Sequence, residues 1–523
     1  MGFVDIYRSL IQTARSLKGR AIILMGRFVM KFILKASLIM AGLFYSVLVQ
    51  AQEPELSCET LASKTITNGN ISSAELIPAG DFDASGSRAS SIYKDLGAFC
   101  RISAILSPVQ GSNIHIEVWM PVQNWNSKLV AVGNGGLAGT VSHDAMAEAV
   151  VEGFAAVSTD TGHVGGDPAF LENEVLLTDF AHRAIHEMTV AAKALVTDYY
   201  SSSPRFTYFN GCSTGGRQAL TAVQRYPTDF DGVVAGAPAN STLRMTMQQL
   251  WNSRIVNDTA GLELGIEDFS LLNNAVMAAC DALDGLQDGI IENPSICMAD
   301  PIAVDGLSGL EVEALRKIYQ GAVNPESGEI IYPGFAKGSE LGWTAMVNRR
   351  PFGYSNDMQS YVVNQDPEWD FLNLDFARDL SVLDSRLNAL GIQAIDPDIS
   401  EFINHGGKLL LYHGWNDPLI SPFNTINYYQ QVQASLGSDA NNAVSLFMMP
   451  AVNHCRGGNG FDSWSKLEVI DSWRESGIKP QSIEAAHIEN EATITTRPLC
   501  AYPGIAIFTG NGSSDSASNF QCQ

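Results

Sequence analysis

The spacing Gly211-x-Ser213-x-Gly215 constrains this chain more than any other feature, because of what lies on either side of it. Residues 206–209 are aromatic and favour a strand, whereas residues 218–224 favour a helix. Glycines two residues before and after a serine permit a sharp turn where a Cβ atom would have no room. The pattern predicts a nucleophile elbow that lifts the Ser213 hydroxyl above a sheet. The alternative is a glycine-rich turn that contains a serine by chance.

An activated serine needs a base, and the base needs an orienting acid. In α/β-hydrolases the acid and then the histidine follow the serine along the chain. Asp417 follows the apolar run 407–414, and His454 follows the apolar run 443–450, so both are predicted to lie in loops at the carboxyl edge of a sheet. We therefore predict Ser213 as nucleophile, His454 as base and Asp417 as the orienting acid.

Other histidines compete with His454, and a lone histidine is more often structural than catalytic. Two of them fall at predicted strand ends and three within a predicted strand or helix: His163, His413, His115, His182 and His186. Thr214 begins the predicted helix after the elbow, so we expect its N–H to be one oxyanion donor.

The residues beside the predicted nucleophile and base are both cysteines. Cys212 precedes Ser213, and Cys455 follows His454. If the triad forms, the two thiols come together, and in an exported protein they would oxidise to a disulfide. The alternative is that each pairs elsewhere. The chain has eight cysteines and no Cys-x-x-Cys pair, which favours disulfides over a zinc site.

The N-terminal region predicts export. Lys31 and Lys35 precede an apolar run, 36–48, that ends before a small-x-small cleavage site at Ala51. A secretory signal starting near Met30 fits this pattern; a membrane anchor is the alternative, but the run is short for a span. The net charge of −24 argues against nucleic acid or an anionic membrane as a partner. We expect a periplasmic or secreted protein with no membrane attachment once the signal is removed.

Short apolar runs alternating with helical patterns predict a mostly parallel sheet covered on both faces. Residues 113–120 alternate with period two and predict an exposed edge strand. Between residues 240 and 398 the buried-strand pattern stops, which indicates an inserted lid. The expected organisation is an extension with signal peptide over 1–51, an α/β core in two parts over 52–239 and 399–523, and the lid between them over 240–398.

An acidic loop in the lid region predicts a calcium site. Asp281, Asp284 and Asp288 place three carboxylates within eight residues, and the carbonyls of Leu286 and Ile290 are natural further ligands. Without a cation the carboxylates would repel one another. The spacing is not that of an EF-hand, and the alternative is a solvated acidic turn.

The chain closely resembles the tannase and feruloyl esterase family. The resemblance is carried by the segments around Ser213, Asp417 and His454, by the acidic loop, and by residues 365–371 in the lid. It implies an α/β-hydrolase core with a large lid, a Ser-Asp-His triad with a disulfide joining its loops, and calcium bound in the lid. It also implies a small aromatic ester as substrate, with feruloyl or other hydroxycinnamoyl esters favoured over galloyl esters and mono(2-hydroxyethyl) terephthalate.

By position in that family, three further disulfides are implied, Cys58–Cys100, Cys280–Cys297 and Cys500–Cys522. The second oxyanion donor would come from the Gly133–Gly136 turn, with Gly136 preferred and Gly135 second. The lid would supply the acyl pocket from its aromatic residues, Trp251, Trp343, Phe352, Tyr354 and Trp369; Arg349 and Arg350 receive no role.

Two other functions fit the same elbow less well. A serine peptidase could use it, but the aromatic lid and the acidic loop disfavour that reading. A non-catalytic binding protein on a decayed hydrolase fold is disfavoured because the serine, the acid and the histidine are all present. No pattern in the sequence specifies an oligomeric state.

Overall fold

The computed structural model describes residues 56–84, 91–137, 139–380, 390–490 and 492–523. The predicted extension and signal peptide, residues 1–51, lie outside the described residues. The described chain belongs to one compact unit, Gln52–Gln523. Within it, none of the helices combines the length and the apolar character needed to cross a lipid bilayer.

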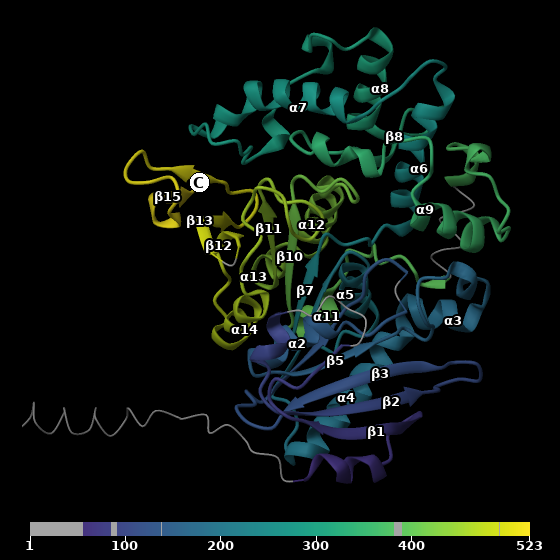
Figure 1. Ribbon diagram of the computed structural model, residues 1–523, viewed down its shortest axis with the longest axis vertical. Coiled ribbons are helices and arrows are strands. Elements are labelled where there is room, and N and C mark those ends of the chain that lie inside the picture. The colour runs from purple at the N-terminus through teal and green to yellow at the C-terminus, as the bar shows by residue number, and fades with distance from the viewer. Residues whose placement is uncertain (1–55, 85–90, 138, 381–389, 491) are drawn as a thin grey trace, which may run out of the picture. The chain divides into compact units, whose positions relative to one another are not determined.

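A nine-stranded sheet organises the molecule (Figure 1), and its order is β1-β2-β3-β5-β4-β6-β7-β10-β11. The strands from β5 to β11 run parallel, whereas β1, β2 and β3 add an antiparallel edge. Their bounds are β1 Gly69–Ile77, β2 Phe99–Leu106, β3 Ile114–Pro121, β4 Lys128–Val132, β5 Ala155–Thr159, β6 Phe206–Cys212, β7 Gly232–Gly236, β10 Lys408–Gly414 and β11 Val444–Met449.

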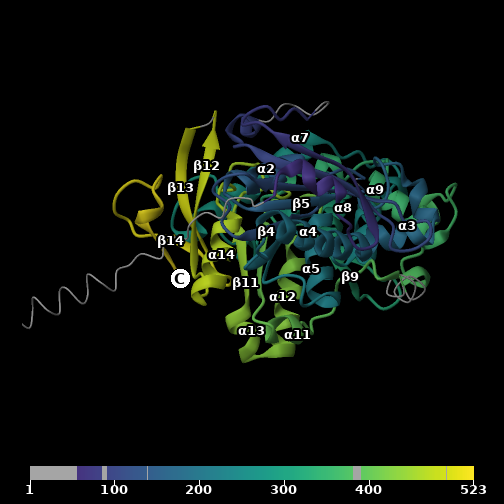
Figure 2. The ribbon, with the colours of Figure 1, turned by 90° about the horizontal axis from the view of Figure 1, so that it is seen from below.

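Helices cover both faces of this sheet, and the predicted α/β-hydrolase class is confirmed. Helices α4, α5 and α12 pack into one hydrophobic cluster with the sheet, and α2 and α14 pack into another on the opposite face. Figure 2 shows the same ribbon turned by 90°, so that the sheet and these helices are seen from below. The α-helices are α2 His143–Val151, α3 Glu174–Thr178, α4 Ala184–Tyr200, α5 Thr214–Arg225, α11 Ser400–Asn404, α12 Pro422–Leu436, α13 Ser438–Ala443 and α14 Lys466–Ser476.

The parallel strands are apolar runs because both of their faces are covered. Every residue of β4, β5, β7 and β11 is buried. The predicted edge position of residues 113–120 is wrong. β3 pairs with β2 on one side and β5 on the other, and its polar residue Glu117 is buried against the Arg101 guanidinium and the Trp119 indole. The alternation of polar and apolar residues over 113–120 arises because Glu117 has hydrogen-bond partners inside the protein, not because one face of the strand is exposed to solvent.

The chain between β7 and β10 includes residues 240–398, which the sequence predicts to be a lid. Its elements are α6 Thr242–Asp258, α7 Ile266–Cys280, α8 Gly309–Gln320, β8 Gly321–Val323, β9 Ile330–Pro333 and α9 Gly353–Asp357. One hydrophobic cluster, which includes Phe269 and Trp343, lies within this segment, whereas another joins the segment to Phe170, Leu177 and Phe180 of the preceding chain. Figure 1 places α7 and α8 beyond one end of the strands. The segment is tied to the core where Gln249 donates to the Leu419 carbonyl and Ser421 donates to the Gly334 carbonyl.

Three two-stranded ribbons complete the strands: β8 with β9, β12 Ser482–Glu489 with β13 Ala492–Cys500, and β14 Ala506–Phe508 with β15 Phe520–Cys522. The last two lie at the C-terminal end of the chain, and β13 packs against β11 and the acidic loop through residues described below.

Candidate active site

Ser213 occupies the turn between β6 and α5, where the sequence predicts an elbow. Its φ of 65° and ψ of −122° place it in a region that L-residues rarely adopt. A Cβ atom on Gly211 would lie 2.6 Å from the backbone of Gly215, so neither strand nor helix could approach as closely with a side chain there. The strained turn is held by the Ser213 N–H, which donates to the Gly236 carbonyl on β7.

Asp417 and His454 lie together at the carboxyl ends of β10 and β11. Nδ1 of His454 is 2.6 Å from Oδ2 of Asp417, and Oδ1 of Asp417 accepts the backbone N–H groups of Leu419 and Ile420. The Asp417 side chain is fully buried, whereas the His454 side chain is 18% exposed. Within the described chain, no hydrogen bond joins the Ser213 hydroxyl to His454, and such contacts often tighten only when substrate binds.

Burial and charge act in opposite directions on this pair. Burial alone would raise the pKa of Asp417, but the charge of His454 and hydrogen bonds from His413 and His454 bring that pKa well below its usual range. Burial would lower the pKa of His454, but the charge and hydrogen bond of Asp417 outweigh it and raise the pKa above its usual 6.5. The pair therefore consists of an ionised carboxylate and an imidazole that is a strengthened base.

A disulfide clamps the two loops that carry Ser213 and His454. Cys212 and Cys455 are bonded across a separation of 243 residues, with Cα atoms 6.0 Å apart. The other three bridges, Cys58–Cys100, Cys280–Cys297 and Cys500–Cys522, match the pairing that the resemblance implied, and no described cysteine is free. The first clamp matters most for the site because each partner is the immediate neighbour of a predicted catalytic residue.

The predicted oxyanion donors lie on two segments that are bonded to each other. Thr214 is the first residue of α5, so its N–H has no carbonyl partner within the helix. Its hydroxyl donates to the carbonyl of Gly136, which has a φ of 57°. Farther along α5, Gln218 accepts the Asn134 N–H and donates to the Asn134 side chain. This Gln218–Asn134 pair, which sequence reasoning missed, fixes the Gly133–Gly136 turn to the helix.

The competing histidines, apart from one, lie in structural positions. His115 contacts Ser103, His163 contacts the Leu137 carbonyl, His182 contacts Tyr226, and His186 pairs with Asp229. His413 is the exception, because its Nε2 lies 3.0 Å from the same Asp417 oxygen that contacts His454. The sequence placed it at a strand end near Asp417 but gave it no role.

The acidic loop is ordered by its own backbone. Asp281 accepts the N–H groups of Asp288, Gly289 and Ile290, while Asp284 accepts that of Leu286. The carboxylates of Asp281, Asp284 and Asp288 therefore share one tight turn closed by the Cys280–Cys297 bridge. In the described part of the chain, no group of three or more His, Cys, Asp or Glu side chains is placed to hold a metal ion.

Arg497 on β13 is the counter-ion that sequence reasoning missed. Its guanidinium lies 2.6 Å from Asp288 and 3.1 Å from the buried Glu292. Burial raises the pKa of Glu292 to about 7, and burial together with the charges of Asp288 and Asp281 raises the pKa of Asp284. Arg497 is thus the one guanidinium that contacts this group of acidic side chains through Asp288 and Glu292.

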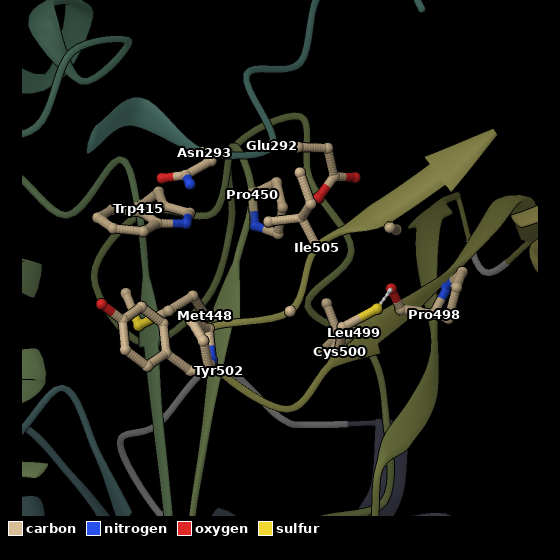
Figure 3. Close-up of a pocket in the computed structure, with 13 residues that line it drawn as sticks. Glu292, Asn293, Trp415, Met448, Pro450, Pro498, Leu499, Cys500, Tyr502 and Ile505 are labelled. Carbon is tan, nitrogen blue, oxygen red and sulfur yellow. Dashed lines mark hydrogen bonds between the residues drawn. The ribbon is translucent and has the colours of Figure 1, made fainter. Parts of the chain in front are cut away.

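Two cavities lie near these features. An open groove of about 950 Å³ passes the disulfide and the oxyanion turn, and its lining includes Gly133, Asn134, Gly135, Cys212, Cys455 and Trp464. Figure 3 shows a smaller cavity of about 20 Å³ between the end of β11 and the C-terminal ribbons, beside Trp415, Met448 and Tyr502. The smaller cavity has room for about one water molecule, and the lining of neither cavity includes Ser213, Asp417 or His454.

The lid aromatics divide into core and site-facing residues. Trp343 is fully buried among Phe269 and Tyr319 in the lid's own core, and Arg349 donates to backbone carbonyls in the same region. Tyr354 instead packs with Leu419 against a cluster that contains Ala239, Met245, Tyr332 and Ile420. This cluster adjoins the site, because the Ala239 N–H donates to the Ser213 carbonyl and the Ile420 N–H donates to Asp417.

The fold and the elbow define an α/β-hydrolase, and comparison with known proteins gives the family. Residues 100–523 match the model of the family described as tannase and feruloyl esterase. A probable feruloyl esterase B-1 from Aspergillus flavus is 33% identical over 81% of this chain and 86% of its own. A probable feruloyl esterase B-2 from Aspergillus terreus is 32% identical over 90% and 95%. The chain belongs to the tannase and feruloyl esterase family and is a carboxylic ester hydrolase.

Solved structures agree with this assignment. The crystal structure of feruloyl esterase B from Aspergillus oryzae superposes with a TM-score of 0.82 at 29% identity, covering 89% of this chain and 99% of the other. The tannin acyl hydrolase from Aspergillus niger superposes with a TM-score of 0.75 at 22% identity, covering 88% of this chain and 92% of the other, and supports the fold alone.

Proposed function

We propose that the protein hydrolyses esters of aromatic acids, with feruloyl and other hydroxycinnamoyl esters as the preferred class, through an acyl-enzyme on Ser213. The observation that carries the proposal is the 2.6 Å contact between Asp417 and His454 on loops that the Cys212–Cys455 bridge ties to the elbow. The substrate class is supported by the relatives, which are named as feruloyl esterases.

In the proposed reaction, Nε2 of His454 takes the Ser213 proton as the hydroxyl attacks the ester carbonyl. Asp417 holds Nδ1–H and stabilises the imidazolium that forms. The oxyanion accepts hydrogen bonds from the Thr214 N–H and from Gly136, with Gly135 as the alternative donor. His454 then gives its proton to the departing alcohol. Water, activated in the same way, releases the aromatic acid and restores Ser213.

The acyl group would lie against the cluster of Ala239, Met245, Tyr332 and Ile420, with Tyr354 from the lid beside it. The leaving alcohol would extend toward the open groove beyond the oxyanion turn. An aromatic ring gains from apolar and aromatic contacts of this kind because its burial removes a large area from water.

Calcium in the lid and export from the cytoplasm complete the proposal. Asp281, Asp284 and Asp288, with the Leu286 and Ile290 carbonyls, would hold one Ca²⁺, whose charge would offset the surplus of carboxylates around Arg497. The four disulfides support an oxidising compartment, and the N-terminal pattern supports a signal peptide cleaved after Ala51.

The experiment compares kcat/KM for methyl ferulate, methyl gallate, mono(2-hydroxyethyl) terephthalate and a short p-nitrophenyl ester, with Ser213→Ala as the matched control. We expect methyl ferulate to be the best of the three aromatic esters and a fluorophosphonate to label only the chain with Ser213. A preference for the gallate or the terephthalate would move the enzyme to that substrate class. Equal labelling of the Ser213→Ala variant would overturn the nucleophile.

A further inference from the structure

His413 is a buried imidazole that the proposed catalytic steps do not use. It lies in β10, four residues before Asp417, and its side chain has no exposure to solvent. Its Nε2 is 3.0 Å from Oδ2 of Asp417 and 3.0 Å from the carbonyl oxygen of Ile420. Its Nδ1 is 2.7 Å from the hydroxyl of Thr425 on α12.

These contacts assign the tautomer of His413. Nε2 faces a carboxylate oxygen and a carbonyl oxygen, which can only accept, so Nε2 carries the proton and donates. The Thr425 hydroxyl can then donate to the free lone pair on Nδ1. Both nitrogens of this buried imidazole therefore have partners, which fixes the direction of the ring.

Asp417 thereby receives four donors on its two oxygens. Oδ1 accepts the Leu419 and Ile420 N–H groups, and Oδ2 accepts His454 Nδ1–H and His413 Nε2–H. A buried carboxylate is costly unless such bonds satisfy it. Three of the donors are fixed by the local backbone or by β10, and only His454 belongs to the loop that follows β11.

We propose that His413 is a positioning residue that fixes the Asp417 carboxylate and shares the charge of Oδ2 with His454. This inference rests on the proposed function. Two N–H groups on one oxygen divide its negative charge, so each bond is weaker than it would be alone. The bond to His454 is then strong enough to orient the imidazole but does not hold the imidazolium too tightly to release its proton to the leaving alcohol.

The groups that can titrate around Asp417 are few. His413 faces it from β10, His454 from the loop after β11, and Tyr332 from β9. Burial and the charge of Asp417 raise the pKa of Tyr332 well above its usual value, so this phenol stays neutral over the pH range of an activity assay. In the His413→Leu variant, His454 is then the one of these three groups left to set the acid limb of activity.

The test uses the full-length processed enzyme with His413→Leu and His413→Gln. Leucine removes all three hydrogen bonds of the His413 imidazole. Glutamine carries an amide nitrogen as many bonds from Cβ as Nε2 and can still donate to Asp417. With leucine, we expect kcat to fall about tenfold at unchanged KM, and the acid limb of kcat/KM to move up by about 0.5 to 1 pH unit. With glutamine, we expect the acid limb to return most of the way to its wild-type pH.

A role limited to structure gives a different result. It would lower the melting temperature of both variants and leave the acid limb where it is in the wild type, which would overturn the proposal. If His413→Leu does not fold, Thr425→Val removes only the hydroxyl that orients Nδ1 and should move the limb in the same direction by a smaller amount. An unmoved limb in a folded Thr425→Val variant would also count against the proposal.

A spectroscopic measurement separates this inference from the proposed function. In protein with ¹⁵N-labelled histidine, we expect low-field N–H resonances from both His454 Nδ1 and His413 Nε2. His413→Leu should remove the second and move the first farther downfield. An inactive wild type with this pattern would overturn the esterase reaction and keep the arrangement, whereas an active wild type whose His454 resonance does not move would overturn the role of His413.

Discussion

The hydroxyl of Thr214 donates a 2.9 Å hydrogen bond to the carbonyl oxygen of Gly136. This bond joins the first turn of α5 to the turn after β4, which are the two segments proposed to supply the oxyanion donors. It orients the peptide plane that follows Gly136, so the turn is held before the substrate arrives. Preorganised donors of this kind are worth more than flexible ones because no reorganisation is needed during the reaction.

Thr214→Val should lower kcat by about tenfold, because it removes the hydroxyl and keeps the shape of the side chain. The Thr214→Ser variant retains the hydroxyl and should stay close to the wild type. Steady-state kinetics on methyl ferulate measure both. Equal activity in the valine and serine variants would show that the turn needs no support from Thr214.

Loss of the Cys212–Cys455 bridge should reduce both stability and activity. In a Cys212→Ala/Cys455→Ala variant we expect a loss of about 2–5 kcal/mol in unfolding free energy and a fall in kcat, because the bridge fixes the distance between the Ser213 and His454 loops. The matched control is Cys58→Ala/Cys100→Ala, whose bridge lies at the opposite edge of the sheet. Denaturation measures the stability of both variants, and kinetics measure their kcat. Similar kcat values in the two variants would show that the Cys212–Cys455 bridge contributes to stability but not to catalysis.

Activity should rise with pH through a midpoint above 6.5, because the pKa of His454 is raised above that usual value and the base must be neutral. The free energy of unfolding depends on pH in the opposite direction. A raised folded pKa means that the Asp417–His454 ion pair contributes fully below about pH 6.5 and is lost as the pH rises through the folded pKa. The pH profile of fluorophosphonate labelling measures the midpoint, and Asp417→Asn should move it down. A midpoint below 6.5 in the wild type would contradict the raised pKa.

Gly211→Ala should prevent the elbow from forming, since the added Cβ would lie 2.6 Å from the Gly215 backbone. Both partners are backbone at the end of β6 and the start of α5, so neither can move without disrupting the sheet. We expect loss of fluorophosphonate labelling and a destabilisation of at least about 2 kcal/mol. Gly97→Ala is the control, because nothing lies within 4 Å of its added Cβ. A stable, reactive Gly211→Ala enzyme would contradict this packing.

Chelation should lower the melting temperature if the acidic loop binds calcium, and elemental analysis should find about one ion per chain. Asp284→Asn should abolish the response to calcium. The exposed Asp398 lies outside the loop, so Asp398→Asn is the matched control and should keep that response. Calcium content unchanged in Asp284→Asn would move the site elsewhere.

Much of the site could be predicted from local sequence. The elbow around Ser213 is a local steric solution, and Asp417 and His454 each follow an apolar run whose burial is readable from composition alone. Parallel strands bring such loops to one edge of the sheet, so the meeting of residues far apart in sequence follows from the fold class. The Cys212–Cys455 pairing follows from the same convergence.

Partners chosen by three-dimensional packing could not be predicted. The interior position of β3 depends on Arg101 and His143, which lie on other elements and satisfy Glu117. Arg497 contacts Asp288 in the acidic loop although the two residues are 209 positions apart in the sequence. The sequence predicted the α/β order and the positions of the proposed nucleophile, acid and base, because each depends on local pattern and strand direction. Only the tertiary structure determined that His413 shares the Asp417 oxygen and that Thr214 holds Gly136, because hydrogen bonds between separate elements depend on side-chain directions that no local pattern encodes.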